Sequence, residues 1–295
     1  MSHPVDPIKA ACVQQAYPPV ASHYKRIASG IAQAVGTGAQ IVVLPELHGK
    51  PYFCQTMRTD LFEWAESVPG PTTGFLSEQA ARYGIVVIGS VFESRAEGIF
   101  HNTAVVLGPD GTLLGIYRKM HIPEDPGYHE KFYFTPGDGD FEPVETPFGS
   151  LGVLVCWDQW FPEAARLMAL KGARVLVYPT AIGWDPQDDN EERRRQYEAW
   201  RIIQRAHAVA NGMHILCCNR TGQETATDGS GCIDFWGGSF ICGPQGELLA
   251  QCDYDAGVIS ADLSWSRCQD VRRLWPFFRD RRIDAYADLK LRWRE

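Results

Sequence analysis

The sequence predicts an α/β fold built from two similar halves, and three observations point to it. Short apolar runs rich in β-branched residues alternate with amphipathic stretches, which is the pattern of strands alternating with helices. Two hairpin turns of the form Gly-Pro-x-Gly interrupt this alternation, one in each half of the chain. A sequence motif in which glycine and alanine precede an apolar run also occurs twice.

The strands are expected at six apolar runs, and the helices at four amphipathic stretches between them. The expected strands cover residues 8–13, 41–44, 85–91, 151–155, 175–178 and 215–218. The expected helices cover residues 24–35, 73–83, 162–170 and 191–210. Pro162 suits the first turn of a helix, and Gly84 and Gly172 suit the residue after a helix end.

The repeated motifs indicate an internal duplication. Residues 38–45 read GAQIVVLP and residues 172–179 read GARVLVYP, an offset of 134, while the hairpin turns begin at Gly108 and Gly243, an offset of 135. Such motifs are common in α/β proteins, but the near agreement of the two offsets favours a duplication. Because no linker rich in Gly, Ser or Pro separates the halves, we expect one domain, residues 1–295, of two stacked sheets with helices outside.

Composition restricts the class of protein. The 295 residues are 45% hydrophobic and 12% aromatic, enough to bury a core, and no unbroken apolar run of about 18 residues predicts a membrane span. The net charge of -8 has the wrong sign for a nucleic-acid surface, so a small or cationic partner fits better. Nine cysteines, several inside apolar runs, and a start without a secretion signal lead us to expect a soluble cytoplasmic protein with free thiols.

Three reactive side chains follow directly after apolar runs, where α/β folds gather their ligands. Glu46 follows IVVLP, Lys119 follows LLGIYR and Cys156 follows LGVLV. A thiol becomes a strong nucleophile when a nearby base takes its proton, and an ammonium group can hold the developing oxyanion. The backbone amide of Trp157 is expected to donate a second hydrogen bond to that oxyanion. Taken singly, the three side chains also fit a helix cap, a solvated strand end and a small core residue.

Longer motifs around these residues resemble the nitrilase, or carbon-nitrogen hydrolase, superfamily. The motifs, which continue over nearly the whole chain, are LPELHGKPYFCQ, YRKMHIPEDPGYHEKFYFTPGD, GVLVCWDQWFPEAARLMALKGA, YPTAIGW, GGSFICGPQGELLA and FFRDRR. The resemblance implies a four-layer αββα sandwich, a catalytic triad of Glu46, Lys119 and Cys156, and a second acid, Glu130, beside the triad. It also implies that the enzyme needs no cofactor or metal and assembles into a homo-oligomer of two or more subunits.

The C-terminal segment, about residues 265–295, is the part expected in oligomer contacts. It contains the aromatic stretch Trp275-Pro-Phe-Phe278, which an isolated subunit would have difficulty covering.

The resemblance further implies a small ureido substrate, and the charge pattern predicts that its tail is cationic. Relatives that act on carbamoyl amino acids are expected to carry arginines after Cys-x-Asp, but Gln159 and Trp160 stand at those places. The resemblance implies hydrolysis of N-carbamoylputrescine to putrescine, carbon dioxide and ammonia, and the absence of these arginines agrees with its cationic tail. The expected substrate contacts are Tyr52, Thr180, Trp184, Asp185 and Asp188.

Five acidic residues after the strand ending at Thr180 are the candidates for holding the ammonium group, although acids there also suit a solvated helix start. They are Asp185, Asp188, Asp189, Glu191 and Glu192. Trp184 and the loop at 222–232 depart from the family pattern, which bears on the fit of the substrate.

Other functions remain as alternatives. A related ureido-acid or amide hydrolase of the same superfamily would share the triad, whereas a non-catalytic scaffold would bind a protein partner through its aromatic surface. Three histidines, His101, His121 and His129, lie fairly close in sequence but lack the spacing of metal ligands, so we expect no metal site there. Residues 36–38 read Gly-Thr-Gly and lack the third glycine of a dinucleotide loop.

Overall fold

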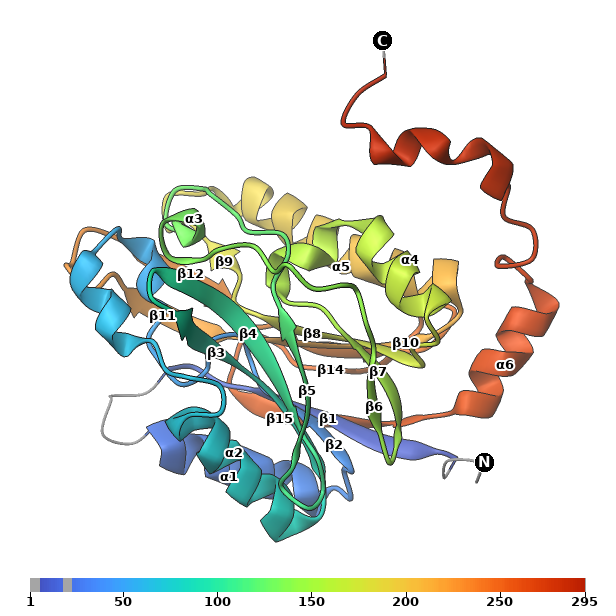
Figure 1. The fold of residues 1–295 in the computed structure, drawn as a ribbon, viewed down its shortest axis with the longest axis horizontal. Coiled ribbons are helices and arrows are strands. Elements are labelled where there is room, and N and C mark those ends of the chain that lie inside the picture. The colour runs from blue at the N-terminus through green and yellow to red at the C-terminus, as the bar shows by residue number, and fades with distance from the viewer. Residues whose placement is uncertain (1–5, 18–22, 295) are drawn as a thin grey trace.

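Two six-stranded β-sheets lie face to face between helices (Figure 1). The structure is a computed structural model and describes residues 6–17 and 23–294. The first sheet has the order β15 (Gly257–Leu263), β1 (Ile8–Gln14), β2 (Ile41–Val43), β3 (Val86–Ala96), β4 (Ile99–Leu107) and β5 (Leu113–Arg118). The second has the order β14 (Leu248–Gln251), β13 (Phe240–Cys242), β10 (His214–Asn219), β8 (Val175–Thr180), β7 (Gly149–Val153) and β6 (Val144–Thr146).

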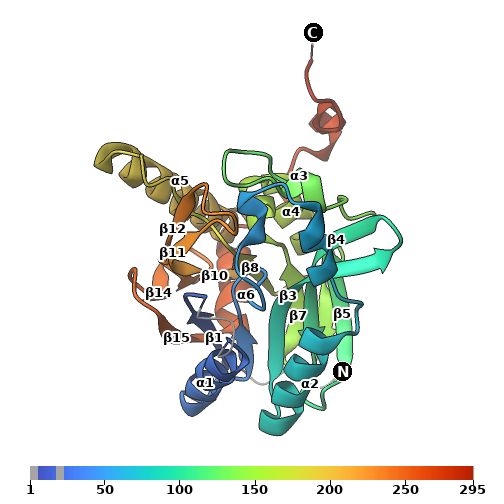
Figure 2. The same cartoon turned by 90° about the vertical axis from the view of Figure 1, so that its left-hand side faces the viewer.

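Helices cover the outer face of each sheet and complete the four layers. Helices α1 (His23–Gly36) and α2 (Pro71–Tyr83) lie on one side of the strands, and α4 (Pro162–Leu170) and α5 (Asn190–Asn211) lie on the other (Figure 2). Smaller elements are the helices α3 (Glu130–Tyr133) and α6 (Trp265–Leu274) and a three-stranded sheet of β11 (Thr221–Thr225), β12 (Cys232–Trp236) and β9 (Gly183–Trp184). The αββα sandwich expected from the sequence is confirmed.

Alternation along the strands explains the layers. In β3, Val86 and Ile88 belong to a buried cluster that includes residues of the second sheet, whereas Val87 packs in a separate cluster with residues of α1 and α2. Successive side chains of a strand point to opposite faces, so each sheet is apolar on both sides. This is why the strands read as nearly continuous apolar runs.

The helix ends lie where the sequence predicts them. Helix α2 has Pro71 in its first turn and ends at Gly84, whose φ of 65° is the left-handed conformation that glycine adopts readily. Helix α5 begins after Asp189, whose carboxylate accepts the backbone amides of Glu191 and Glu192. All four expected helices are present, with ends within two residues of the expected ones.

The strand order reproduces the predicted duplication. Strands β1, β2 and β3 are parallel neighbours, as are β7, β8 and β10 in the second sheet. Each trio is followed by two antiparallel strands that are joined by one of the Gly-Pro-x-Gly turns, β4–β5 in the first sheet and β13–β14 in the second. The two sheets are therefore built to one plan.

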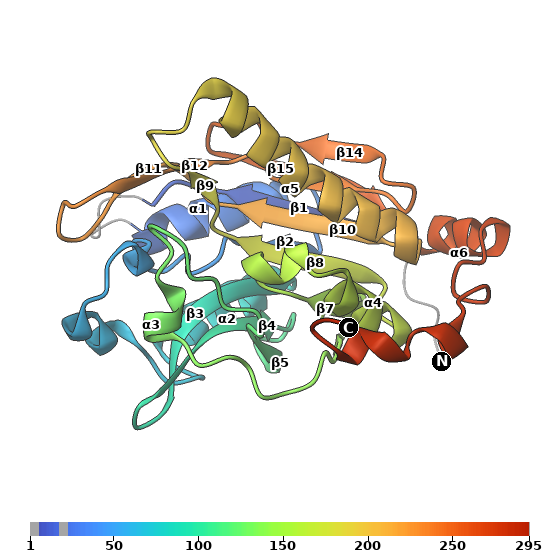
Figure 3. The same cartoon turned by 90° about the horizontal axis from the view of Figure 1, so that it is seen from above.

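Some elements are not evident from the sequence pattern. The strands β9, β11 and β12 and the helix α6 were not expected, because they are short or polar. Helix α6 lies at the end of the molecule opposite the β11–β12 loop, and the segment after it runs away from the sheets (Figures 1 and 3).

Within residues 6–17 and 23–294, no helix has both the length and the apolar character needed to cross a membrane. The first five residues, on which the expectation of no secretion signal partly rests, lie outside the described residues.

Candidate active site

The side chains of Glu46, Lys119 and Cys156 come together although they follow three separate strands. Glu46 lies three residues after β2, Lys119 directly follows β5, and Cys156 lies three residues after β7 and begins a short 3-10 turn, Cys156–Trp160. All three are buried. Strand β2 belongs to the parallel part of the first sheet, and β7 belongs to the parallel part of the second. Their carboxyl ends lie in the same region, as the rule for ligand sites in α/β folds predicts.

Lys119 forms the centre of the site. Its Nζ donates to Oε1 of Glu46 at 2.8 Å and to Oε2 of Glu130 at 2.7 Å, and none of the three side chains is more than 1% exposed. Burial by itself would lower the pKa of Lys119, but the carboxylates of Glu130 and Glu46 outweigh this effect and hold the pKa well above its ordinary value. The amine is therefore a fixed ammonium group.

Glu46 has one oxygen free for chemistry. Its Oε1 accepts from Lys119 and from Nδ2 of Asn102, at 2.7 Å, whereas its buried Oε2 has no hydrogen-bond partner among the described residues. Asn102 is itself oriented by Ser90, whose hydroxyl donates to Oδ1 of Asn102 at 2.9 Å. A carboxylate with an unused oxygen beside a thiol is the arrangement that a general base needs.

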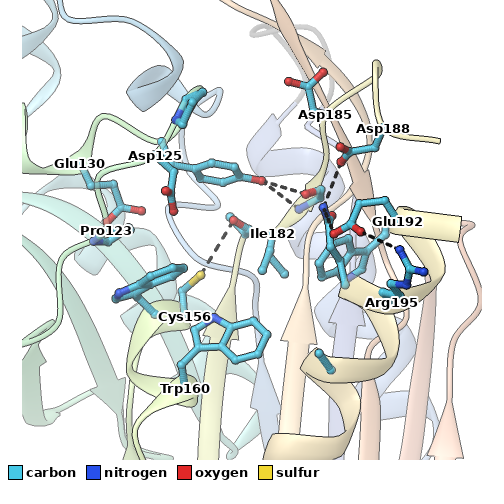
Figure 4. Close-up of a pocket in the computed structure, with 18 residues that line it drawn as sticks. Pro123, Asp125, Glu130, Cys156, Trp160, Ile182, Asp185, Asp188, Glu192 and Arg195 are labelled. Carbon is cyan, nitrogen blue, oxygen red and sulfur yellow. Dashed lines mark hydrogen bonds and ion pairs between the residues drawn. The ribbon is translucent and has the colours of Figure 1, made fainter. Parts of the chain in front are cut away.

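Cys156 is held as a thiol rather than a thiolate before substrate arrives. Burial raises the pKa of the Cys156 thiol, and the Glu46 carboxylate raises it further, while the Lys119 ammonium group opposes both. The sulfur lies 3.9 Å from the carbonyl oxygen of Ala181 (Figure 4). A reaction that uses this sulfur as a nucleophile would first have to remove its proton, and the Glu46 carboxylate lies close enough to influence the pKa of the thiol.

Two left-handed residues mark the turns that present these side chains. Leu47, next to Glu46, has a φ of 48°, and Cys156 has a φ of 43°, both unusual for residues other than glycine. Such conformations cost about 1–3 kcal/mol each and persist only where surrounding contacts enforce them.

Asp158 supplies contacts that enforce the turn at Cys156. Its carboxylate accepts the backbone amide of Val155 at 2.9 Å, the hydroxyl of Tyr117 at 2.9 Å and the backbone amide of His121 at 3.0 Å. Because Tyr117 and His121 flank Lys119 in the sequence, Asp158 links the end of β5 to the turn that carries the thiol.

The pKa of Glu130 lies above its ordinary value. Burial raises the pKa of Glu130 to about 7, although the Lys119 ammonium group lowers it and the hydroxyl of Tyr52, which donates to Oε1 at 2.7 Å, lowers it as well. The Glu46 carboxylate raises it, since two acids share one ammonium group.

A cavity of about 590 Å³ opens above the thiol. Its lining near the sulfur includes Cys156, Trp157, Trp160 and Glu130, with Trp236 also in the wall (Figure 4). A volume of this size suits a small molecule.

Part of the cavity wall is acidic. Asp125, Asp185, Asp188 and Glu192 line it, and Arg195 is the one basic residue among the lining residues of the described chain. In Figure 4, Asp125 points toward the space above Cys156, whereas the carboxylate of Asp185 points away from the thiol.

Part of the predicted acidic cluster is structural. Asp189 caps α5 and Glu191 pairs with Arg195, and neither lines the cavity. The alternative of a solvated helix start therefore applies to these two, while Asp185, Asp188 and Glu192 line the cavity.

Three residues predicted to contact the substrate do not line the cavity. Trp184 lies outside the cavity, because pairing of β9 with β12 turns its ring toward Tyr197 and Trp236 and its Nε1 donates to the carbonyl of Arg193. Thr180 is fully buried, and its hydroxyl oxygen lies 3.0 Å from the carbonyl oxygen of Tyr178 and 3.3 Å from Oε1 of Gln159, either of which can accept its proton.

Tyr52 is the third, since it contacts Glu130 rather than the cavity. Its hydroxyl therefore lies beside the Glu130 carboxylate.

Several lining residues were missed by sequence reasoning. Asp125 lies inside a motif that was used for the resemblance, and Arg195 follows the acidic cluster on α5, but neither type of residue is unusual in a loop or on a helix surface. Only their position in the lining of the cavity that Cys156 also lines, which the sequence pattern does not reveal, distinguishes them.

The three histidines do not gather. Nδ1 of His101 lies 2.8 Å from the carbonyl of Thr135, while His121 contacts Asp158 and His129 contacts Glu124. Among the described residues no three His, Cys, Asp or Glu side chains are arranged to hold a metal ion.

Comparison with known proteins identifies the family. The model of the carbon-nitrogen hydrolase family matches residues 9–273. The chain belongs to this family. It is therefore a hydrolase that acts on carbon–nitrogen bonds, and the predicted resemblance to the nitrilase superfamily is confirmed.

Individual carbon-nitrogen hydrolases are similar over most of their length. An N-carbamoylputrescine amidase of Oryza sativa subsp. japonica is 43% identical over 262 residues, covering 88% of this chain and 86% of the relative. A citrullinase of Francisella tularensis is 36% identical over 285 residues, covering 96% and 98%. The crystal structure of a carbon-nitrogen hydrolase from Helicobacter pylori G27 has a TM-score of 0.95 and 47% identity, covering 98% of this chain and all of that one.

We predict that kcat/KM rises with pH through about 7 as Glu130 ionises. Protonated Glu130 would leave Lys119 paired with Glu46 alone, which makes Glu46 a weaker base. In Tyr52→Phe the Glu130 carboxylate loses a hydrogen bond that stabilises its ionised form, so the pKa of Glu130 rises. The rise of kcat/KM with pH should then occur roughly one pH unit higher, equivalent to about 1.4 kcal/mol. The measurement is ammonia release from pH 5 to 9.

Tyr133→Phe is the matched control. Its hydroxyl is buried in the same aromatic cluster and donates to the carbonyl of Thr56, but it contacts neither acid. If kcat/KM of Tyr52→Phe rises at the same pH as in the wild type, or if Tyr133→Phe shifts the rise equally, this account of Glu130 is wrong.

Proposed function

We propose that this hydrolase converts N-carbamoylputrescine and water to putrescine, carbon dioxide and ammonia. The observation that carries the proposal is the charge of the cavity. Cys156 lines the cavity, with the fully buried Glu46 carboxylate and Lys119 ammonium group behind it, and four acidic residues, Asp125, Asp185, Asp188 and Glu192, also line the cavity. The similarity to plant N-carbamoylputrescine amidases supports the same substrate.

In the first half of the proposed reaction, Glu46 accepts the proton of Cys156 through its unused Oε2. The sulfur attacks the carbamoyl carbon, and the negative charge that develops on the carbonyl oxygen is held by the Lys119 ammonium group and the backbone amide of Trp157. Glu46 returns the proton to the leaving nitrogen as its bond to carbon breaks. The product is a thioester-like acyl enzyme and a free amine.

In the second half, a water molecule replaces the departed amine. Glu46 takes a proton from this water while its oxygen attacks the acyl carbon, and the proton is returned to the sulfur as the carbon–sulfur bond breaks. The released carbamic acid decomposes to carbon dioxide and the second amine. Glu130 keeps Lys119 in place throughout, because it is the second carboxylate bound to the ammonium group.

The ammonium tail of the substrate is proposed to lie among the acidic residues of the cavity wall. The amide Nε2 of Gln196 lies 3.2 Å from Oδ2 of Asp188 and 3.3 Å from Oε1 of Glu192, and so orients both carboxylates. Asp125 faces the space above the thiol (Figure 4). A cation is attracted by this wall, whereas a carboxylate is repelled.

Citrulline is a second candidate, and Arg195 is the observation that favours it. Citrulline carries an amine and a carboxylate at the end of its chain, and a guanidinium group in the cavity wall suits the carboxylate. However, Arg195 already pairs with Glu191 and lies 3.6 Å from Glu192. Because these carboxylates neutralise it, we favour the purely cationic tail.

The subunit is also proposed to form a homo-oligomer through its C-terminal segment, residues 275–294. This segment exposes large apolar side chains after it leaves α6, including Ile283, which is 74% exposed, and Trp293, which is 84% exposed. Exposed apolar side chains on an extended segment are typical of a surface that a second copy covers.

The cytoplasm is the proposed location. All nine cysteines are free, and eight of them are buried, which suits a reducing compartment.

We predict that Cys156→Ala abolishes ammonia release and leaves the fold intact. The substitution removes the nucleophile but only one buried sulfur atom, so the cavity it leaves is small. Activity and circular dichroism are measured on the same sample. Cys232→Ala, which removes the one partly exposed thiol, should keep full activity; turnover by Cys156→Ala would refute the proposed role of Cys156.

We predict that kcat/KM for N-carbamoylputrescine exceeds that for 5-ureidopentanoate, its matched analogue with a terminal carboxylate. A charge-assisted hydrogen bond to the ammonium group contributes about 1.5–3 kcal/mol, or roughly 10- to 150-fold. Butylurea, without a charge, should fall between the two, and citrulline is assayed as the competing substrate. Equal rates for the two charged tails would overturn the proposed substrate.

The residues responsible are tested by Asp125→Asn, Asp188→Asn and Glu192→Gln. At least one should reduce the preference for the cationic tail, whereas Glu198→Gln, on the same helix as Glu192 but outside the cavity, should not. Arg195→Gln separates the two candidates, because it should reduce hydrolysis of citrulline only if the guanidinium group binds its carboxylate. A preference that survives all three acidic substitutions would place its source elsewhere.

We predict that light scattering gives a mass of two or more subunits at micromolar concentration. Ile283→Ser and Trp293→Ser should lower this mass, since each removes an exposed apolar side chain from the segment. Met57→Ser, at a position that is 60% exposed but outside the segment, is the control and should not change it. A monomeric wild type would contradict the proposal.

A further inference from the structure

A buried arginine lies behind the turn that carries Glu46. Arg220 directly follows β10 and is 2% exposed, and its Nη2 donates to the backbone carbonyls of Glu46 at 3.1 Å, Leu47 at 2.8 Å and Lys50 at 3.1 Å. Three carbonyl oxygens that point to one place repel each other, so a cation between them is what allows the chain to turn there. The left-handed φ of Leu47 lies within this turn.

Glu224 completes a buried ion pair with this arginine. Both of its carboxylate oxygens accept from Nη1 of Arg220, at 2.7 and 2.9 Å. Its Oε2 also accepts the backbone amide of Tyr52 at 2.8 Å. Glu224 lies on β11, in the polar segment that departs from the family pattern, so this segment contributes a charge to the interior.

The same ion pair is linked to Glu130 through Tyr52. Tyr52, whose amide Glu224 holds, donates its hydroxyl to Oε1 of Glu130 at 2.7 Å. Arg220 therefore contacts the backbone of Glu46, and Glu224 acts on Glu130 through one residue. Neither Arg220 nor Glu224 lines the catalytic cavity.

We infer that the Arg220–Glu224 ion pair is a positioning element that sets the placement of Glu46 and Glu130 around the Lys119 ammonium group. It acts on the base and not on the substrate, so it should affect kcat and leave KM nearly unchanged. The inference rests on the proposed roles of Glu46 and Glu130.

The test compares Glu224→Gln and Arg220→Lys with the wild type. Glutamine has the shape of glutamate and can still accept the amide of Tyr52, but it removes the charge that orients Arg220. Lysine keeps the positive charge and lacks the fork that bonds several oxygens at once. We expect kcat to fall about 10- to 100-fold while KM changes less than about threefold, the result of a small displacement of catalytic groups.

Alkylation of Cys156 by iodoacetamide is the second measurement, because it reports removal of the thiol proton without any substrate. The rate is corrected with the Cys156→Ala protein, since Cys232 is partly exposed. It should fall in both variants by a factor similar to that of kcat. If no ureido compound is hydrolysed by the wild type, the proposed function fails, and the alkylation rates still decide the positioning role.

Arg205→Lys is the matched control. Nε of Arg205 also donates to a backbone carbonyl, that of Gly246 at 2.7 Å, but in a hairpin turn remote from the cavity. Its kcat and alkylation rate should match those of the wild type. Unchanged rates in Glu224→Gln, an effect on KM alone, or an equal loss in Arg205→Lys would overturn the inference. If Arg220→Lys fails to fold, Glu224→Gln alone tests the inference, because glutamine fills the same volume as glutamate.

Discussion

The buried ammonium group of Lys119 is the constraint on which the site depends. A charge without access to water is costly, and it is tolerated here because two carboxylates, Glu46 and Glu130, bind it directly. Each carboxylate in turn needs partners, which Asn102 provides for Glu46 and Tyr52 for Glu130. Removing one member of such a set costs about 3–5 kcal/mol, so the arrangement is rigid because any other placement leaves a buried charge unpaired.

The folded chain also holds two strained turns that the catalytic chemistry requires. Leu47 and Cys156 both adopt a left-handed backbone, and each turn is held by a buried charged side chain from elsewhere in the sequence. Asp158 binds the amide of Val155 before the thiol, and Arg220 binds three carbonyls around Leu47. In both places the strain is local, whereas the groups that oppose it come from the packing of separate strands.

The two halves of the fold contribute unequally to a site that lies where they meet. The repeat offset of 134 makes Thr180, at the end of β8, the equivalent of Glu46, and the amide of Glu46 donates to the carbonyl of Thr180 at 3.3 Å. The first half supplies Glu46, Lys119, Glu130 and the cavity-lining Asp125, while the second supplies Cys156 and the other acidic lining residues, Asp185, Asp188 and Glu192. Two equivalent strand ends therefore meet face to face, and only one of them carries an acid.

The sequence by itself determined the main strands and helices of the two sheets and their covering layers, the duplicated arrangement and the placement of Glu46, Lys119 and Cys156 at strand ends. These features follow from local rules: hydrophobic alternation sets the elements, glycine and proline set the turns, and a reactive residue directly after an apolar run lies at the rim of a sheet. Only the tertiary structure decided which side chains surround the substrate cavity. Trp184 turns away because β9 pairs with β12, and Asp125 and Arg195 line one cavity although a loop and a helix carry them. The Arg220–Glu224 pair is likewise invisible in the sequence, because the direction of a side chain depends on contacts between segments that are far apart along the chain.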